Sequence, residues 1–403
     1  MATYKEQNKL NVPHLRFPEF HGEWCISTIG EQFDLYSGNT PSRLNKAHFE
    51  GNVNWITSGE LKEHYISDTK EKISEVAATA NNLKLLHPGT FVIAIYGLEA
   101  DGVRGTGSIT CKESTISQAC MAFTQKGDVK NEFLYSWYKK HGNIIGIKYA
   151  QGTKQQNLSY DILEKFHIAY PSQDEQDKLI KFISLLDERI ATQSKLIEKL
   201  ESLIKGICNN YFEKLSVQEE AYLIRLSDIL KERNEYCCKD GKFIHGTLSK
   251  DGIFPKTGRW DRDFLVKQED KKYKVTHLDD ICYNPANLKF GVICRNTFGD
   301  LIFSPIYVTF EVCKNVNIGF IELYLTNHNF IEKVRRFEQG TVYERMAVSP
   351  EDFLSYKIRI PSYSDQTFFY KKVQWLIKLS QNEMKLLSQY KKLRQYLLRE
   401  MFI

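Results

Sequence analysis

Basic and amide side chains that could contact nucleic acid are concentrated in segments without carboxylates. No Asp or Glu occurs in residues 35–49, 133–160 or 281–299, whereas each of these segments contains Lys or Arg. Such segments suit contact with phosphate groups, because no negative side chain opposes the backbone of a nucleic acid. A solvated protein surface produces the same pattern, and this alternative stays open for each segment. The net charge of +5 on 403 residues is only mildly basic and decides little by itself.

The candidate contacts form two sets, one in each half of the chain. Lys and Arg supply charge for phosphates, Arg can also bind guanine O6 and N7 in a bidentate manner, and Gln can pair with adenine N6 and N7. The predicted DNA contacts are Arg43, Lys46, Arg104, Lys154, Gln155 and Gln156 in the first half and Arg259, Lys289, Arg295, Tyr343 and Arg345 in the second. Loop hydration remains the alternative for the two glutamines, and a surface arginine without a role remains the alternative for Arg104.

The sequence predicts no catalytic residue, no bound cofactor and no metal site on this chain. It contains no Gly-x-x-x-x-Gly-Lys-Ser/Thr loop that could bind ATP. The segment Asn284-Pro285-Ala286-Asn287 is similar to the Asn-Pro-Pro-aromatic corner of adenine methyltransferases, but it lacks the second proline and the aromatic residue, which favours a turn after a strand. Gly105-Thr106-Gly107 is followed by a strand-like run and not by a helix, so we interpret it as a hairpin turn.

Length and cysteine content suggest a large intracellular protein. A chain of 403 residues exceeds one ordinary core and predicts two or three domains. The nine cysteines include no Cys-x-x-Cys pair, which indicates reduced thiols in a cytoplasmic protein. The first ten residues are polar, and no run approaches the roughly 18 apolar residues that a membrane-spanning helix needs.

The chain contains an internal repeat. Residues 171–212 align with residues 361–402 at a constant offset of 190 and without a gap. Identical residues in this alignment include Gln176 with Gln366 and Phe212 with Phe402. A fixed internal period identifies a duplicated structural unit. The predicted order along the chain is therefore a globular module, a long helix, a second module and a second long helix.

Both repeats carry the pattern of a long helix that packs along one face. In the first copy apolar residues are spaced 4-3-4-3 from Leu179 onwards, which is typical of a coiled coil, and only Gln193 interrupts them. The second copy has Ser380, Glu383 and Arg394 at equivalent positions, so its apolar stripe is shifted and poorer. The predicted contact residues of the helix pair are Leu179, Ile183, Leu186, Ile190, Ile197, Leu200, Ile204, Leu376, Leu386, Leu387, Tyr390, Leu393 and Leu397.

Helix length determines the predicted architecture. A helix of about 39 residues spans roughly 58 Å, so the second module must begin at the far end of the first helix. If the second helix packs on the first, the two run antiparallel, and the modules lie at opposite ends of a helical spacer. Strand-like runs at residues 90–95, 119–123, 281–283, 292–294 and 307–312, with helical patterns at 131–140 and 318–337, predict mixed α and β structure in both modules.

Several of these segments resemble the specificity subunit of type I restriction-modification enzymes. The opening residues 12–20, Val-Pro-His-Leu-Arg-Phe-Pro-Glu-Phe, followed by Trp24, are similar to the start of that family. The junction of residues 152–159, Gly-Thr-Lys-Gln-Gln-Asn-Leu-Ser, with Glu175-Gln176 resembles the end of a target-recognition domain and the start of a conserved helix. The second junction departs from the pattern, because it has Met-Ala-Val-Ser at residues 346–349 and Asp365-Gln366. The resemblance covers essentially the whole chain.

The resemblance implies an α+β fold in which two mixed α/β target-recognition domains are separated by a long antiparallel two-helix coiled-coil spacer with pseudo-two-fold symmetry. The implied boundaries are an N-terminal segment at 1–22, recognition domains at 23–171 and 215–361, and helices at 172–214 and 362–403.

The function that the resemblance implies is that of a non-catalytic subunit which recognises a bipartite, asymmetric DNA site. It would hold two modification subunits, which carry S-adenosylmethionine and methylate adenine N6, and the motor-nuclease subunits, which use ATP and Mg. Two alternatives stay open: a helical scaffold without DNA specificity, and a self-sufficient DNA methyltransferase whose motifs the sequence lacks.

Overall fold

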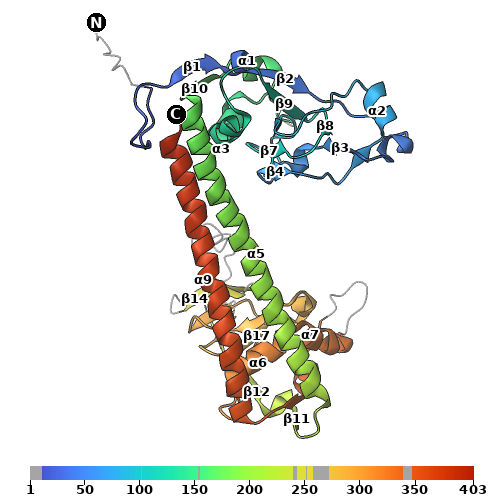
Figure 1. The fold of residues 1–403 in the computed structure, drawn as a ribbon. Helices are drawn as coiled ribbons and strands as arrows, with labels where there is room; N and C mark the ends of the chain where they lie inside the picture. Colours follow the sequence, from blue (N-terminus) through green and yellow to red (C-terminus); the bar gives the residue numbers. More distant parts are fainter. Residues whose placement is uncertain are drawn as a thin grey trace. The chain divides into compact units, whose positions relative to one another are not determined.

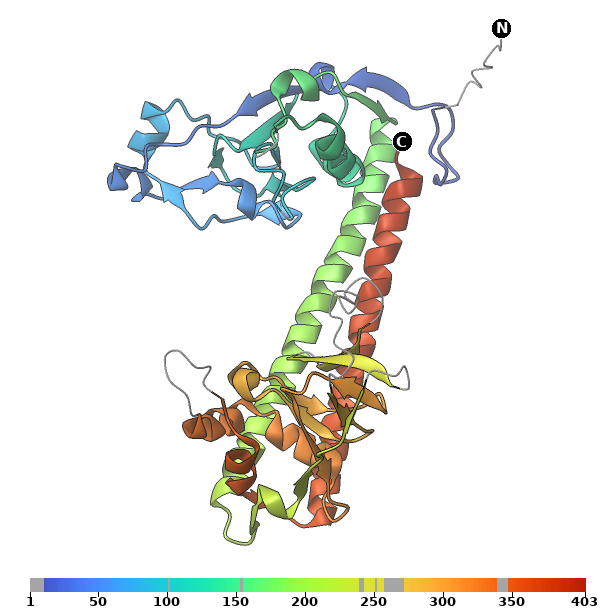
Figure 2. The same ribbon diagram turned by 180° about the vertical axis from the view of Figure 1, so that it is seen from behind.

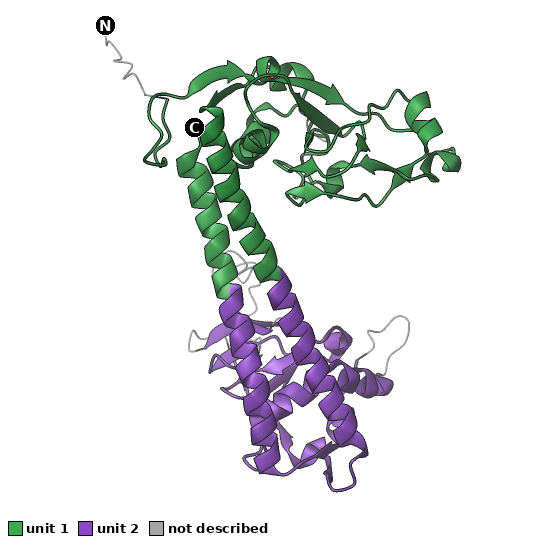
Figure 3. Cartoon of the chain, viewed as in Figure 1, with its two compact units in different colours: residues 1–194, 385–403 green, residues 195–384 purple. Residues whose placement is uncertain are grey.

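The computed structural model describes residues 11–100, 102–152, 155–238, 243–250, 252–256, 272–338 and 347–403. The chain divides into two compact units (Figure 3): unit 1 comprises Met1–Ser194 with Lys385–Ile403, and unit 2 comprises Lys195–Met384. Two long helices, α5 (Gln173–Val217) and α9 (Tyr363–Met401), each contribute one part to unit 1 and another part to unit 2. Among the described residues, no helix is long and apolar enough to cross a membrane.

Unit 1 contains a five-stranded sheet of order β2-β9-β6-β7-β4, a three-stranded sheet of order β5-β3-β8 and the pair β1-β10 (Figure 1). The strands are β1 (Cys25–Thr28), β2 (Phe33–Ser37), β3 (Val53–Ile56), β4 (Tyr65–Ile66), β5 (Lys72–Ile73), β6 (Phe91–Ala94), β7 (Gly107–Thr110), β8 (Ser114–Ile116), β9 (Cys120–Gln125) and β10 (His167–Tyr170). The helices are α1 (Ile29–Gln32), η1 (Lys46–Phe49), η2 (Ser58–Glu60), α2 (Glu75–Ala80), α3 (Asn131–Tyr149) and α4 (Tyr160–Leu163).

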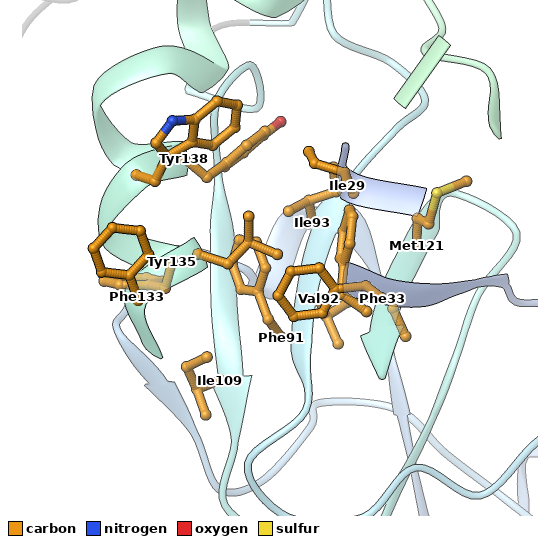
Figure 4. Close-up of a cluster of buried hydrophobic side chains, with 14 of the residues drawn as sticks. Ile29, Phe33, Phe91, Val92, Ile93, Ile109, Met121, Phe133, Tyr135 and Tyr138 are labelled. Carbon is orange, nitrogen blue, oxygen red and sulfur yellow. The ribbon is translucent and has the colours of Figure 1, made fainter. Parts of the chain in front are cut away.

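The core of unit 1 forms where α3 covers the five-stranded sheet. All four side chains of the central strand β6 are buried, which is why this run is apolar throughout and does not alternate. The Phe91 ring meets the rings of Tyr135 and Tyr138 from α3 edge to face, at centroid distances of 6.0 and 5.8 Å (Figure 4). Its centroid lies 5.4 Å from that of Phe123 of β9. These aromatic contacts hold α3 on the sheet.

Unit 2 contains sheets of order β12-β20-β17-β18 and β13-β16-β19-β14-β15 and the pair β11-β21. The strands are β11 (Tyr222–Arg225), β12 (Leu230–Glu232), β13 (Tyr236–Cys237), β14 (Ile244–Ser249), β15 (Gly252–Pro255), β16 (Tyr273–Thr276), β17 (Ile281–Tyr283), β18 (Ile293–Arg295), β19 (Leu301–Phe303), β20 (Val308–Val312) and β21 (Lys357–Ile360). The helices are η3 (Leu226–Asp228), η5 (Pro285–Phe290), α6 (Ile318–Leu325), α7 (His328–Val334), η6 (Arg335–Phe337) and α8 (Pro350–Ser355). The predicted mixture of α and β structure is confirmed in both units.

The two units share one local arrangement at the start of their long helices. In unit 1, the Gln176 side chain donates to the Pro171 carbonyl (3.0 Å) and accepts from the Lys130 backbone N–H (3.0 Å). In unit 2, the Gln366 side chain donates to the Pro361 carbonyl (2.9 Å) and accepts from the Asn317 backbone N–H (2.9 Å). Both glutamines are buried. Each links the start of a long helix to the residue that precedes a helix of its mixed domain, Lys130 before α3 and Asn317 before α6. The helix α3 lies beside the start of α5 in both views (Figures 1 and 2).

The long helices face each other through the residues at every third or fourth position. In unit 1, Leu179 and Ile183 of α5 belong to the same buried cluster as Leu397 and Met401 of α9, so the first part of α5 packs against the last part of α9. In unit 2, the Tyr211 ring of α5 stacks on Phe369 of α9 at 3.7 Å, so the last part of α5 packs against the first part of α9.

Most residues predicted for the contact between the helices are buried or partly buried. Leu179, Ile183, Ile197 and Leu397 are buried, and Leu186, Ile190, Leu200, Ile204, Leu376, Leu386, Leu387 and Tyr390 are partly buried.

The prediction for Leu393 was wrong, because its side chain is 45% exposed. The inward position belongs to Arg394, whose guanidinium Nη2 donates to Asp187 Oδ2 of α5 at 3.1 Å. A cation is stable at this position because the carboxylate on the facing helix compensates its charge.

Candidate nucleic-acid interface

The loop between β2 and β3 presents Arg43 and Lys46. Nη1 and Nη2 of Arg43 donate to the two carboxylate oxygens of Glu71 at 2.9 and 2.8 Å, and the guanidinium lies 4.9 Å from the ring centroid of Phe49. The hydrogen bonds to Glu71 raise the pKa of Arg43, and the same bonds lower the pKa of Glu71. Contact with a guanine edge would therefore exchange Glu71 for the base, because both offer a pair of acceptors to the same donor fork.

Lys46 is the first residue of η1 and is exposed. Asn45 caps this short helix by accepting a hydrogen bond from the Ala47 backbone N–H at 3.2 Å. The Lys46 ammonium is thus carried on a fixed backbone. Contact of Arg43 and Lys46 with DNA stays a prediction.

Arg104 is held inside unit 1. Its Nη2 donates to Gln156 Oε1 at 2.7 Å, and its aliphatic stem covers Gly146 of α3, where an added Cβ would lie 2.5 Å from Arg104 Cγ. The backbone N–H of Gln156 donates to Glu99 Oε2 at 2.8 Å. The bond from Arg104 holds the side-chain oxygen of Gln156, and the bond to Glu99 fixes its backbone. Gln156 could contact a base from this orientation. Arg104 would first have to break its hydrogen bond with Gln156 before it could contact DNA.

Two further predicted DNA contacts of unit 1 are Gln155 and Lys154. Gln155 is exposed, and no described hydrogen bond fixes its side chain. Lys154 lies outside the described residues.

In unit 2, Arg295 lies within reach of two carboxylates. Its Nε is 3.6 Å from Asp279 Oδ1 and 3.5 Å from Glu322 Oε2, and its side chain is largely buried. Burial raises the pKa of Glu322, while Arg295 acts in the opposite direction. Because these carboxylates compensate the guanidinium inside the unit, Arg295 offers little free charge to a phosphate.

Lys289 is the other described candidate of unit 2. It lies at the end of η5, partly buried, with its ammonium 5.3 Å from the ring centroid of Phe290. Arg259, Tyr343 and Arg345 lie outside the described residues. Their contact with DNA stays a prediction, as does that of Lys289 and Arg295.

Sequence reasoning missed a buried polar cluster around Lys274 of β16. The Lys274 ammonium donates to Glu232 Oε1 (3.1 Å), Asn234 Oδ1 (3.0 Å) and the Tyr236 hydroxyl (3.4 Å), although only 1% of the residue is exposed. Arg233, which lies between Glu232 and Asn234 in the sequence, donates two hydrogen bonds of 2.8 and 3.0 Å to the buried Asp280. The polar run Glu-Arg-Asn-Glu at residues 232–235 was the available signal. These bonds fix the segment that joins β12 to β13.

His64 of unit 1 lies in a second polar cluster that the sequence did not reveal. Its Nε2 is 2.8 Å from Glu132 Oε2 of α3, and its Nδ1 is 3.5 Å from Asp187 Oδ2 of α5. The imidazole is stacked between the rings of Tyr65 (4.1 Å) and Tyr135 (3.9 Å). Burial lowers the pKa of His64, but the hydrogen bonds with Asp187 and Glu132 outweigh it, so the pKa is raised above 6.5.

We expect the His64 contribution to stability to depend on pH. A raised pKa in the folded state means that the contribution is fully present below the ordinary pKa of 6.5 and is lost as the pH rises through the raised value. His64→Phe keeps a ring between the two tyrosines but removes the charge. Its loss of unfolding free energy relative to wild type should therefore be larger at about pH 5.5 than at about pH 9.

Urea unfolding at both pH values measures this difference, and His87→Phe, at an exposed histidine near Glu113, is the control. An equal loss at both pH values for His64→Phe would show that the imidazole is not charged in the folded protein.

Part of the chain is similar in sequence to known proteins. Residues 21–202 match a family model described as "Type I restriction modification DNA specificity domain". The chain is 27% identical over 194 residues to the Type I restriction enzyme MjaIX specificity subunit of Methanocaldococcus jannaschii, which covers 47% of this chain and 44% of the relative. It is 25% identical over 216 residues to the MjaVIII specificity subunit of the same organism, covering 53% and 47%. The matched region thus spans about half the length of these relatives.

Solved structures resemble the chain over nearly its whole length. The S subunit of a Type-I restriction-modification system from M. genitalium has a TM-score of 0.61 and 18% identity, covering 97% of this chain and 99% of that one. A chain from a structure titled for complex assembly and conformational transition of the type I R-M system has a TM-score of 0.57 and 13% identity, covering 94% and 97%. At these identities the likeness shows the fold.

Proposed function

Because residues 21–202 match the model of the type I restriction-modification DNA specificity domain, we propose that this chain is the DNA-specificity subunit of a type I restriction-modification complex. The resemblance inferred from the sequence is thereby confirmed, and the match over residues 21–202 is the observation that carries the proposal. In this role the chain recognises a bipartite, asymmetric DNA site. The first recognition domain, residues 23–171, reads one half, and the second, residues 215–361, reads the other.

The duplicated helix start supports a two-fold plan. Gln176 and Gln366 make the same pair of contacts in their own units, 190 positions apart. We propose that this arrangement is part of a pseudo-two-fold internal repeat in which α5 and α9 form an antiparallel coiled-coil spacer between the recognition domains. The antiparallel order β2-β9-β6-β7 of unit 1 recurs in unit 2 as β12-β20-β17-β18. The additional sheets, β5-β3-β8 and β13-β16-β19-β14-β15, differ between the units, which supports the recognition of two different half-sites.

In the proposed complex, this chain binds no cofactor and performs no chemistry. Two modification subunits supply S-adenosylmethionine and methylate adenine N6, and the motor-nuclease subunits use ATP and Mg.

Exposed apolar residues on the long helices support two equivalent partner contacts. Leu185 of α5 and Trp375 of α9, at equivalent positions of the repeat, are 55% and 65% exposed. Leu203 and Leu393 form a second exposed pair at the same offset. Solvent-exposed apolar side chains in a repeated pattern suit the docking of two copies of one protein.

The proposal predicts that the purified chain alone transfers no methyl group to DNA. Co-expressed with the modification subunit from the same operon, it should produce N6-methyladenine at a bipartite site, which methylome sequencing reads directly. DNA binding should weaken steeply with salt, because Lys and Arg release counterions from phosphates. Methyl transfer by the chain alone would favour a self-sufficient methyltransferase, and salt-insensitive or absent DNA binding by the complex would favour a helical scaffold.

The spacer proposal predicts that helix length sets the gap between the half-sites. Four residues inserted after both Gln193 and Glu383, which are equivalent in the repeat, would lengthen each helix by about 6 Å and turn it by about 40° beyond one full turn. At roughly 3.4 Å per base pair, the unspecified gap should grow by one or two base pairs while both half-sites stay the same.

Methylome sequencing of a strain with the double insertion tests this. Four residues inserted after Glu219, between α5 and β11, are the control and should leave the gap unchanged. An active double variant with the original gap would mean that the helices do not set the spacing.

A further inference from the structure

Leu44 lies at the tip of a turn whose backbone is fixed on both sides. Its side chain is 98% exposed, more than any other large apolar side chain in the described part of the protein. The Asn45 backbone N–H donates to the Ser42 carbonyl at 3.3 Å, and the Asn45 side chain then caps η1. On the other side, Arg43 is held by its two bonds to Glu71. The turn therefore cannot easily bend to bury the leucine against the protein.

The charge around Leu44 indicates what could cover it. A single exposed leucine needs no explanation, because much of a protein surface is apolar. Here, however, the leucine is flanked by Arg43 and Lys46 in residues 35–49, a segment without carboxylates. Glu71, from outside this segment, is paired with Arg43, so the exposed Lys46 carries the charge that can meet a phosphate. A partner that presents an apolar slot between negative charges fits this arrangement. Duplex DNA has that chemistry, because stacked bases lie between two lines of phosphates.

Unit 2 repeats the combination at an unrelated position. Phe290 is 65% exposed and follows Lys289 at the end of η5, within the carboxylate-free residues 281–299. Its backbone is also fixed: Asn284 caps η5 by accepting from the Ala286 N–H at 3.1 Å, and Gly291, with φ of 77°, donates to the Leu288 carbonyl at 2.8 Å. Leu44 and Phe290 are not equivalent in the internal repeat, so the shared combination is an independent observation in each unit.

We infer that Leu44 and Phe290 are wedges that the two recognition domains insert between adjacent base pairs of the DNA, while Lys46 and Lys289 hold the neighbouring phosphates. The inference rests on the proposed function and deepens it. An inserted apolar side chain unstacks one base step and bends the duplex. Pyrimidine–purine steps unstack most easily, so each wedge adds a preference for such a step in its half-site without any hydrogen bond to a base.

The test uses the full chain in complex with its modification subunits, bound to a duplex that carries the site found by methylome sequencing. 2-Aminopurine, whose fluorescence rises when it is unstacked, is placed at one position at a time through both half-sites, leaving out the methylated adenines, which a methyltransferase flips out of the stack by itself. We expect one strong signal in each half-site. Leu44→Ala should abolish the signal in one half-site only, Phe290→Ala should abolish it in the other, and each should weaken binding about tenfold.

Two exposed apolar residues beside carboxylates provide matched controls. Val76→Ala, next to Glu75 on α2, and Leu278→Ala, next to Asp279, should change neither the fluorescence nor the affinity. Thermal unfolding should be unchanged in all four variants, because each truncates an exposed side chain.

Each result decides between the inference and the function on which it rests. Salt-sensitive DNA binding without a 2-aminopurine signal, or a signal that persists in Leu44→Ala and Phe290→Ala, overturns the wedges and leaves the proposed function standing. Loss of complex assembly in Leu44→Ala would assign the residue to a protein partner and also overturn the wedge. If the wild-type complex bound no DNA, the proposed function would fail and the inference with it.

Discussion

Replacing Asp187 with alanine is expected to lower the free energy of unfolding by about 3–5 kcal/mol. The Asp187 side chain is 16% exposed and faces both Arg394 of α9 and His64. Its removal leaves the largely buried guanidinium of Arg394 without its carboxylate, and a buried charge without a partner is costly. The nearby Lys139 increases this cost. Burial, and secondly the charge of Arg394, lower the pKa of Lys139 to about 8, which shows that its positive charge is already unfavourable before Asp187 is removed.

Urea unfolding of the purified chain measures this loss. Asp177→Ala is the matched control, because Asp177 lies on the same helix and also forms an ion pair, with Lys130, but is 61% exposed. We expect the control to cost no more than about 1 kcal/mol. The double variant Asp187→Leu with Arg394→Leu should recover most of the loss, since two apolar side chains can replace a buried ion pair. Equal losses in Asp187→Ala and Asp177→Ala would contradict a buried pair between α5 and α9.

Exchange of residues 24–170 for the corresponding domain of a relative is expected to change one half of the methylated site and leave the other half intact. The sheets and α3 of this segment share one core with Leu179 of α5 and Phe402 of α9, so the segment can be exchanged as a block only if these apolar contacts are kept. Each mismatched base pair typically costs about 1–3 kcal/mol in binding. Methylation of the original half-site should therefore fall by orders of magnitude while the new one appears.

The graft must keep the contacts that join the domain to the long helices. The incoming domain needs a backbone N–H that donates to Gln176, as that of Lys130 does. It also needs a side chain that pairs with Asp187, as His64 does. The reciprocal exchange of residues 222–360 is the matched control and should change only the other half. Methylome sequencing reads both results, and a single exchange that alters both halves would contradict one domain for one half-site.

Features set by neighbours along the chain were predictable from the sequence. The run around β6 was recognised because its residues are β-branched or aromatic between turn residues, and the strand occupies Phe91–Ala94. The inward positions of α5 followed from the spacing of apolar residues, because a helix returns to the same face every 3.6 residues. The equivalence of Gln176 and Gln366 was visible as a repeat at a fixed offset, and the structure adds the hydrogen bonds that each glutamine makes.

The sequence alone thus determined the order of elements, the repeated helix start and the segments without carboxylates, because these depend on local pattern. The tertiary structure decided which Arg side chains are already compensated by a carboxylate inside the protein. Arg394 points inward and Leu393 outward because Asp187, 207 positions away, supplies the compensating charge. Arg295 lies in a segment without carboxylates, yet Asp279 and Glu322 reach it from outside that segment. Electrostatic compensation depends on distances in space, which a segment of sequence does not contain. The sequence could therefore identify candidate DNA contacts, but it could not show which of them keep an uncompensated charge.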